Sequence, residues 1–179
     1  MNSHPLPRPT DRVRENFLRT QWTAAQALAA QSDLISLQPV ALDGGVPDRG
    51  VVSFYCTSLL RNPDGAIVEG HCFDVGFWFS EDYLRRADPR VVTLLQPWNV
   101  WHPNIRFPAI CLGHILPGTP LVDLIYQVFD ILAFNNWAAA DSLHADAAQW
   151  ARGNQHRFPT DRRPLKWRAP ARAAAGGRA

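Results

Sequence analysis

The segment WNVWHPNIRFPAICL, residues 98–112, is the most informative part of this 179-residue chain. It contains the tripeptide His102-Pro103-Asn104, and Cys111 follows seven residues after the asparagine. Residues 98–118 include three prolines, which predict an irregular loop, yet they are also rich in Trp and Ile. Loops normally avoid so much apolar surface, so we expect this one to pack onto the body of the protein.

Upstream of this loop, four segments have the composition or the alternation of β-strands. They are residues 34–42, 51–60, 70–79 and 90–97. In residues 51–60 one predicted face holds Val52, Phe54 and Cys56, and in residues 70–79 one predicted face holds His71, Phe73, Val75, Phe77 and Phe79. The sequence Asn62-Pro63-Asp64-Gly65 is a strong turn signal, because proline presets φ and glycine tolerates the positive φ that closes such turns. Four strands joined by short connections predict an antiparallel meander.

Helical patterns stand on both sides of this strand region. Thr10 or Asp11 can cap a first helix that continues to about residue 31, with an apolar face at Val13, Phe17, Ala24 and Leu28. A strongly apolar helix is expected over residues 119–135 and an amphipathic one over residues 143–154. The order predicts an α+β fold with helices on one side of a four-stranded sheet.

Composition and charge divide the chain into three parts. Residues 1–10 hold three prolines and predict an extended lead, and residues 11–158 form one domain. Residues 159–179 contain six Lys or Arg and one Asp, and they predict a basic, disordered tail. The remaining 12 basic and 15 acidic residues give residues 1–158 a net charge of −3, which argues against nucleic-acid binding.

Several broad classes of protein are excluded by the same composition. The apolar runs are too short to span a bilayer, and the N-terminus lacks the pattern of a signal peptide, so we expect a soluble cytoplasmic protein without membrane partners. Three cysteines without a CxxC pair fit neither a disulfide scaffold nor a zinc site. No metal is therefore expected.

The His-Pro-Asn tripeptide followed by Ile110-Cys111-Leu112 resembles the active-site segment of ubiquitin-conjugating enzymes. Residues 73–83 resemble the family's third strand and the loop after it. Thr119-Pro120 stands where the family has Ser-Pro, and Asp141-Ser142-Leu143 stands where it has Asp-Pro-Leu. The resemblance covers residues 11–158 and implies the fold of that family, with an N-terminal helix, a central crossover helix and one C-terminal helix.

The chain also departs from the family pattern. Gly118 replaces the tryptophan that precedes Ser-Pro, and many relatives have two C-terminal helices. Such divergence resembles the bacterial conjugating enzymes that accompany an activating enzyme and a ubiquitin-like protein in phage-defence operons. This analogy implies a bacterial, antiviral pathway.

The resemblance implies a role for each residue of the candidate site. Cys111 accepts the C-terminus of a ubiquitin-like modifier as a thioester from an activating enzyme and passes it to a target amine. Asn104 shapes the loop or donates to the oxyanion, although it can also be a simple turn former. Asp141 orients the incoming lysine, although an N-cap of the last helix explains it equally well. His102 and Pro103 are structural. The resemblance implies no cofactor, because ATP is used by the activating enzyme.

The same resemblance indicates surfaces for partners. Phe79, Thr119 and Pro120 would contact a ligase. Three arginines of the first helix would contact the activating enzyme, although a solvated helix face explains them as well. They are Arg12, Arg14 and Arg19.

Two other functions remain open alternatives. The first is a non-catalytic binding module of the same fold, which usually lacks the cysteine. The second is a cysteine hydrolase that pairs Cys111 with His102, His114 or His144, although no segment resembles a hydrolase histidine motif. A lone cysteine is usually a small buried hydrophobe, and we expect this of Cys56 and Cys72 because both lie in strand patterns.

Overall fold

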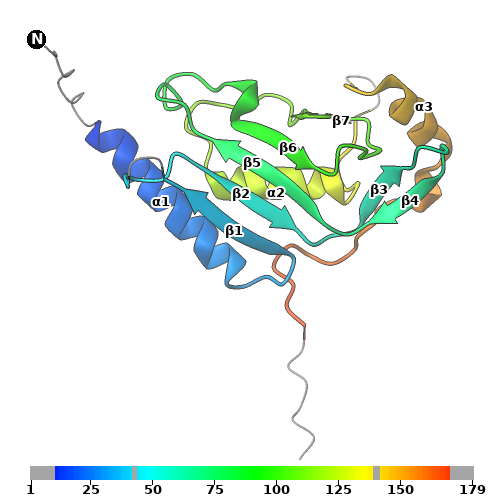
Figure 1. Cartoon of the computed structure of the whole chain (residues 1–179), viewed down its shortest axis with the longest axis horizontal. Helices are drawn as coiled ribbons and strands as arrows, with labels where there is room; N and C mark the ends of the chain where they lie inside the picture. The colour runs from blue at the N-terminus through cyan, green and yellow to red at the C-terminus, as the bar shows by residue number, and fades with distance from the viewer. Residues whose placement is uncertain (1–10, 42–43, 139–141, 170–179) are drawn as a thin grey trace, which may run out of the picture.

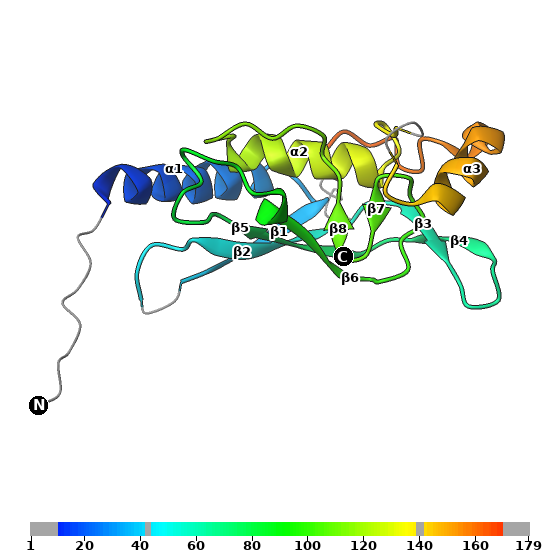
Figure 2. The same cartoon turned by 90° about the horizontal axis from the view of Figure 1, so that it is seen from above.

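The computed structural model describes residues 11–41, 44–138 and 142–169. In these residues the first two α-helices cover one face of the larger antiparallel sheet, and the third α-helix lies beside a separate two-stranded ribbon (Figures 1 and 2). In chain order the elements are α1 (Arg12–Ala29), β1 (Ile35–Val40), β2 (Arg49–Phe54), β3 (Ser58–Arg61), β4 (Ile67–Gly70), β5 (Phe73–Trp78), η1 (Pro89–Val91), β6 (Val92–Gln96), β7 (Ile105–Arg106), β8 (Ala109–Ile110), α2 (Leu121–Leu132), α3 (Ala145–Gly153) and η2 (Gln155–Arg157).

The main sheet has six strands in the order β1-β2-β5-β6-β8-β7, so the expected four-stranded meander was wrong. The two additional strands come from the proline-rich loop. β7 and β8 form a hairpin, and β8 joins the sheet where Ala109 pairs with Thr93 of β6. Strands of two residues are too short to produce an alternating pattern, which is why the sequence predicted only an irregular segment.

The predicted strand over residues 51–60 is interrupted in the structure. The backbone N–H of Thr57 donates to Asp161 Oδ2 (2.9 Å), and the hydroxyl of Thr160 donates to the carbonyl of Thr57 (2.6 Å). Because these bonds occupy the backbone groups of residue 57, the chain leaves the main sheet and continues as β3. β3 then pairs with β4 in a separate ribbon, through the predicted turn at residues 62–65, where Gly65 has a φ of 89°.

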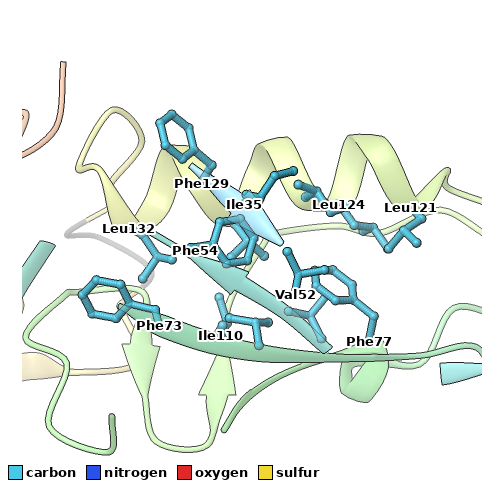
Figure 3. Packing of buried hydrophobic residues seen from close by; sticks show 14 of the residues in the cluster. Ile35, Val52, Phe54, Phe73, Phe77, Ile110, Leu121, Leu124, Phe129 and Leu132 are labelled. Carbon is cyan, nitrogen blue, oxygen red and sulfur yellow. The ribbon is translucent and has the colours of Figure 1, made fainter. Parts of the chain in front are cut away.

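The core lies between this sheet and α2, as Figure 3 shows. The predicted inner face of residues 70–79 is confirmed for four aromatic and aliphatic side chains, whereas His71 is exposed because β5 begins only at Phe73. The four buried residues are Phe73, Val75, Phe77 and Phe79. α2 contributes the opposite side of the core through Leu121, Leu124, Ile125, Val128, Ile131 and Leu132.

Asp11 caps the first helix, and Thr10 lies outside the described residues. The carboxylate of Asp11 accepts from the N–H groups of Val13 and Arg14 (both 3.1 Å). The predicted apolar face was only partly right, since Val13 is 70% exposed and Ala24 is exposed. The residues that α1 buries are Leu18, Gln21, Trp22, Ala25 and Leu28.

The two later helices are shorter than predicted at both ends. α2 begins after Pro120, and the side-chain oxygen of Gln21 from α1 accepts from the N–H of Leu121 at its buried start (3.0 Å). The helix ends because Phe134 adopts a φ of 58°. α3 starts at Ala145, where the ring of His144 accepts from the N–H of Ala147 (3.4 Å).

Residues 159–169, the C-terminal segment, pack onto the body, so the expected disorder does not hold there. Leu165 is 2% exposed, and the buried hydroxyl of Ser32 donates to its carbonyl. The N–H of Asp33 donates to the carbonyl of Trp167 (2.9 Å). Figure 1 shows the segment in orange, running from α3 toward the start of β1. Residues 1–10 and 170–179 lie outside the described residues, so the extended lead remains a prediction.

Candidate active site

The candidate nucleophile, Cys111, directly follows the β7–β8 hairpin. Ile105 pairs with Ile110 in this hairpin, which brings the residues at its open end opposite each other. The N–H of Cys111 donates to the carbonyl of Asn104 (2.8 Å). The seven-residue spacing between Asn104 and Cys111 is therefore the spacing that closes this hairpin. The side chain of Cys111 is half-buried.

Asn104 is 7% exposed and connects the hairpin to the chain after α2. Its backbone N–H donates to Nδ1 of His102 (3.0 Å), and its side-chain oxygen accepts from the N–H of Ala138 (2.9 Å). Because the oxygen faces a backbone donor, the amide nitrogen is directed elsewhere. Among the hydrogen bonds between described residues, that of the side-chain oxygen to Ala138 is the one that the Asn104 amide makes.

His102 is fully buried, and its ring lies 4.2 Å from the ring of Phe134, measured between centroids. Burial lowers the pKa of His102 to about 3, so the ring is neutral near pH 7. Nδ1 accepts from Asn104, which places the proton on Nε2. Nε2 has no partner within the described part of the chain. These features suit a structural residue of the loop rather than a base.

Pro103 connects the loop to the last helix. It is buried, and its carbonyl accepts from the N–H of His144 (3.1 Å). The ring of His144 stands edge-on to Trp101 with the centroids 4.8 Å apart, and burial is the main cause that lowers its pKa. The start of α3 is thus attached to the same loop that carries Cys111.

Asp141, the third predicted catalytic residue, lies outside the described residues. The described chain stops at Ala138, which is bonded to Asn104, and resumes at Ser142. Its role in orienting an amine therefore remains a prediction, whereas the alternative of an N-cap of the last helix was wrong, because α3 begins at Ala145 and has His144 as its N-cap. The side chain that caps α3 in the structure is that of His144.

The other two cysteines differ from Cys111 in their surroundings. Cys56 is buried, and burial raises its pKa to about 12. Cys72 is exposed, so its expected burial was wrong; it lies in the turn between β4 and β5, outside the alternating strand. Partial desolvation and the nearby Asp74 raise the pKa of Cys72, which disfavours its thiolate.

One of the residues predicted to contact a ligase is buried. Phe79 has no exposed surface and packs against Phe17, Trp22 and Tyr83, because the inward alternation of β5 continues one residue beyond the strand. A partner cannot contact this side chain directly. Its assignment as a surface residue was therefore wrong.

The arginines of α1 are placed differently from one another. Arg12 and Arg19 are exposed. Arg14 donates through Nη2 to the carbonyl of Phe79 (2.7 Å) and through Nε to that of Ser80 (3.3 Å). It therefore attaches α1 to the loop after β5, whereas Arg12 and Arg19 are available to a partner.

Thr119 and Pro120 precede α2, and Pro120 is exposed. The hydroxyl of Tyr83 donates to the carbonyl of Thr119 (2.9 Å), and burial raises the pKa of Tyr83 to about 12. Nearby Leu116 is 60% exposed, although the sequence did not indicate that it is a surface residue. Its position between Ile115 and Pro117 gives no pattern that distinguishes it from the packed part of the loop.

Comparisons with known proteins support the fold. No family model matches the chain, and no curated protein matches its sequence. Among solved structures, the chain is similar to the E2 domain of a ubiquitin-conjugating enzyme from Toxoplasma gondii, with a TM-score of 0.54 and 20% sequence identity. The match covers 83% of this chain and 92% of that one. The chain therefore has the fold of a ubiquitin-conjugating E2 domain.

Two kinds of structural feature are not found among the described residues. No helix among them has the length and apolar character that crossing a bilayer requires. In the same residues, His, Cys, Asp and Glu side chains do not gather in groups of three that could hold a metal ion.

Proposed function

We propose that this protein is a conjugating enzyme that carries a ubiquitin-like modifier on Cys111. The observation that carries the proposal is the placement of a half-exposed cysteine at the open end of a hairpin, with its backbone bonded to Asn104 (2.8 Å). An E2-like fold surrounds this hairpin. Transthiolation needs an accessible thiolate, and the position of Cys111 satisfies that condition.

The proposed reaction has two steps at the sulfur. The Cys111 thiolate attacks the thioester carbonyl held by the activating enzyme, a new C–S bond forms, and the thiolate of that enzyme leaves. A neutral target amine then attacks the carbonyl carbon, the Cys111 thiolate leaves, and the amine loses its proton to solvent or a base. The second step develops negative charge on the carbonyl oxygen.

Asn104 is the proposed donor to this oxyanion. Its side-chain oxygen is engaged by the N–H of Ala138, so the amide nitrogen is the group left to donate. Its backbone is fixed on both sides, by His102 and by Cys111. Such fixed donors favour catalysis because they need no reorganisation during the reaction.

The remaining parts of the proposal concern partners. Asp141 orients and desolvates the incoming lysine. Arg12 and Arg19 contact the activating enzyme, and Thr119 and Pro120 contact a ligase; all four residues are described, and none of them is buried. The pathway is a bacterial antiphage system in the cytoplasm, as the divergent sequence suggests. Identifying the neighbouring genes tests that last point.

The cysteine hydrolase alternative is less well supported. His102 is buried and neutral, and the ring of His144 accepts from the helix backbone. His114 is exposed. Among the hydrogen bonds of the described residues, none joins the sulfur of Cys111 to a histidine ring. A hydrolase needs such a base to activate its nucleophile.

The direct test is reconstitution with the cognate activating enzyme, ATP and modifier. We expect a conjugate that a reducing agent removes, that is lost in Cys111→Ala and that persists in Cys72→Ala. Cys72 is the matched control because it is also exposed. A conjugate that forms equally well in Cys111→Ala would contradict the assignment, and absence of any thioester in the folded wild type would favour the binding module.

A further inference from the structure

An apolar pocket of about 430 Å³ opens beside Cys111, which forms part of its wall. One side consists of Ala87, η1 and the start of β6, including Val92. The other side consists of β8 and the loop after Cys111, and Leu143 before α3 also lines the pocket. The pocket is therefore continuous with the candidate nucleophile.

The walls of this pocket are fixed by the fold. Leu112 and Ile115 are half-buried and pack against the main core, so the loop between them has a defined position. Gly113, between them, has a φ of 79°, and no atom lies within 4 Å of the position that a Cβ would take. The chain bends at this glycine, whose positive φ disfavours any other residue.

The charges around the pocket favour a neutral occupant. Its lining residues include Arg90 and His114 but no carboxylate. The lining therefore offers a cationic side chain no partner for an ion pair. Arg90 is already paired with Asp88 (2.7 Å), so its charge is largely compensated and attracts an acidic group only weakly.

We propose that this pocket binds an apolar side chain within the last few residues of the modifier that Cys111 carries. The inference rests on the proposed function. An extended peptide joined to the sulfur through its C-terminal carbonyl spans about 3.5 Å per residue, so its third residue lies within roughly 10 Å of Cys111. A side chain there can enter the pocket, which is large enough for leucine or phenylalanine and which is lined mainly by apolar groups.

Synthetic peptide thioesters test this without the modifier or the activating enzyme. Acetyl-Xaa-Gly-Gly thioesters of 2-mercaptoethanesulfonate, with Leu, Arg or Asp as Xaa, differ only in the third residue from the carbonyl. The Cys111 thiolate forms a C–S bond to the terminal glycine carbonyl, and the mercaptoethanesulfonate thiolate leaves. Mass spectrometry of the intact protein and of its peptides measures the second-order rate of acylation at Cys111.

We expect the Leu peptide to acylate Cys111 about tenfold faster than the Arg or Asp peptide. A tenfold change corresponds to ~1.4 kcal/mol, which lies within what partial burial of a leucine supplies. Ala109→Trp should fill the pocket from an exposed position on its edge and remove the preference. The matched control is Ala66→Trp, an equally exposed alanine in the turn between β3 and β4, which should leave the preference intact.

Labelling by iodoacetamide, which is too small to need the pocket, separates pocket filling from loss of a reactive thiol. Its rate at Cys111 should change less than twofold in Ala109→Trp. The inference would be overturned if the three peptides react at equal rates, or if the Arg or Asp peptide reacts faster. It would also be overturned if Ala109→Trp keeps the preference for Leu, or if no peptide acylates Cys111. Because these assays omit the activating enzyme, failure of enzymatic charging would contradict the proposed function and leave the pocket result standing.

Discussion

The β7–β8 hairpin and the C-terminal segment are both irregular, proline-containing parts of the chain, but they are held in place differently. The hairpin is closed by backbone bonds between near neighbours, such as Asn104 and Cys111. The C-terminal segment depends on partners more than 100 residues away, above all the pairing of Asp161 with Thr57 (2.9 Å). Asp161 is 4% exposed, and Arg163 also donates to its carboxylate (2.5 Å).

The hairpin is therefore held by contacts that are local in the sequence, and the C-terminal segment by contacts that are long-range. Changes in the hairpin should affect the site more than the stability of the fold, because the bond that closes the hairpin joins Asn104 to Cys111 within one loop. Changes in the C-terminal segment should affect stability first, because its bonds join the end of the chain to the break between β2 and β3. The predictions below test this separation.

Truncation after Thr160 should have the largest effect. It removes the buried Leu165, the partly buried Trp167 and the Asp161 bonds, and we expect the free energy of unfolding to fall by about 4 kcal/mol or more. Urea denaturation measures this. Truncation after Ala169 is the control and should change little. A Thr160 truncation that unfolds like the full chain would show that the segment does not support the fold.

Asp161→Ala should destabilise the fold by about 2–3 kcal/mol, because it leaves the N–H of Thr57 and the Arg163 guanidinium without their buried acceptor. Asp64→Ala is the control. Its carboxylate also accepts a backbone N–H, that of Ala66, but on an exposed turn, so its cost should stay below about 1 kcal/mol. An equal loss of unfolding free energy in the two variants would argue against Asp161 as the main anchor of the C-terminal segment.

Asn104→Asp separates two roles of the candidate oxyanion donor. The variant keeps an oxygen for the N–H of Ala138 and loses the amide donor. We expect normal charging at Cys111 but discharge to lysine slower by ~10-fold or more. Asn99→Asp, in the same loop, is the control; the side chain of Asn99 donates to the carbonyl of Arg61 instead. Wild-type discharge in Asn104→Asp would assign Asn104 a structural role alone.

The smallest predicted effect is the acid dependence contributed by Asp161. Burial raises the pKa of its carboxyl, but hydrogen bonds from Arg163 and Thr57 outweigh this, and the net pKa lies below the ordinary value of 3.8. The ionised form therefore stabilises the fold at and above pH 5, and this contribution is lost as the pH falls below about 4. The free energy of unfolding, measured from pH 7 to pH 3, should fall less steeply in Asp161→Asn than in the wild type. Parallel curves would contradict this assignment.

The same contrast explains which parts of the molecule the sequence could predict. The inner faces of β2 and β5 and the existence of the three α-helices follow from apolar periodicity. The active-site loop was recognised from a motif contained in fifteen residues, but its two short strands were not predicted. The C-terminal segment has only Leu165 and Trp167 to indicate packing. Its main anchor is a carboxylate bonded to a distant backbone, and neither hydropathy nor spacing reveals such a contact.

Cys72 and Phe79 show two different limits within the strand region. For Cys72 the alternation could not indicate that β5 begins only at Phe73. For Phe79 the alternation predicted the inner face correctly, and the family resemblance, which assigned this residue to a partner surface, was wrong. The pocket beside Cys111 was equally inaccessible to prediction, because its walls come from three separate stretches of the chain.

The central claim, that Cys111 passes a modifier on rather than merely binding or hydrolysing it, is tested most directly by a single-turnover chase. Thioester preformed on Cys111 is separated from ATP and the activating enzyme, and its decay is followed with and without free lysine. We predict that lysine accelerates the decay and that the modifier appears as a lysine amide. Decay at the same rate in both samples, with release of the free carboxylic acid, would contradict the claim.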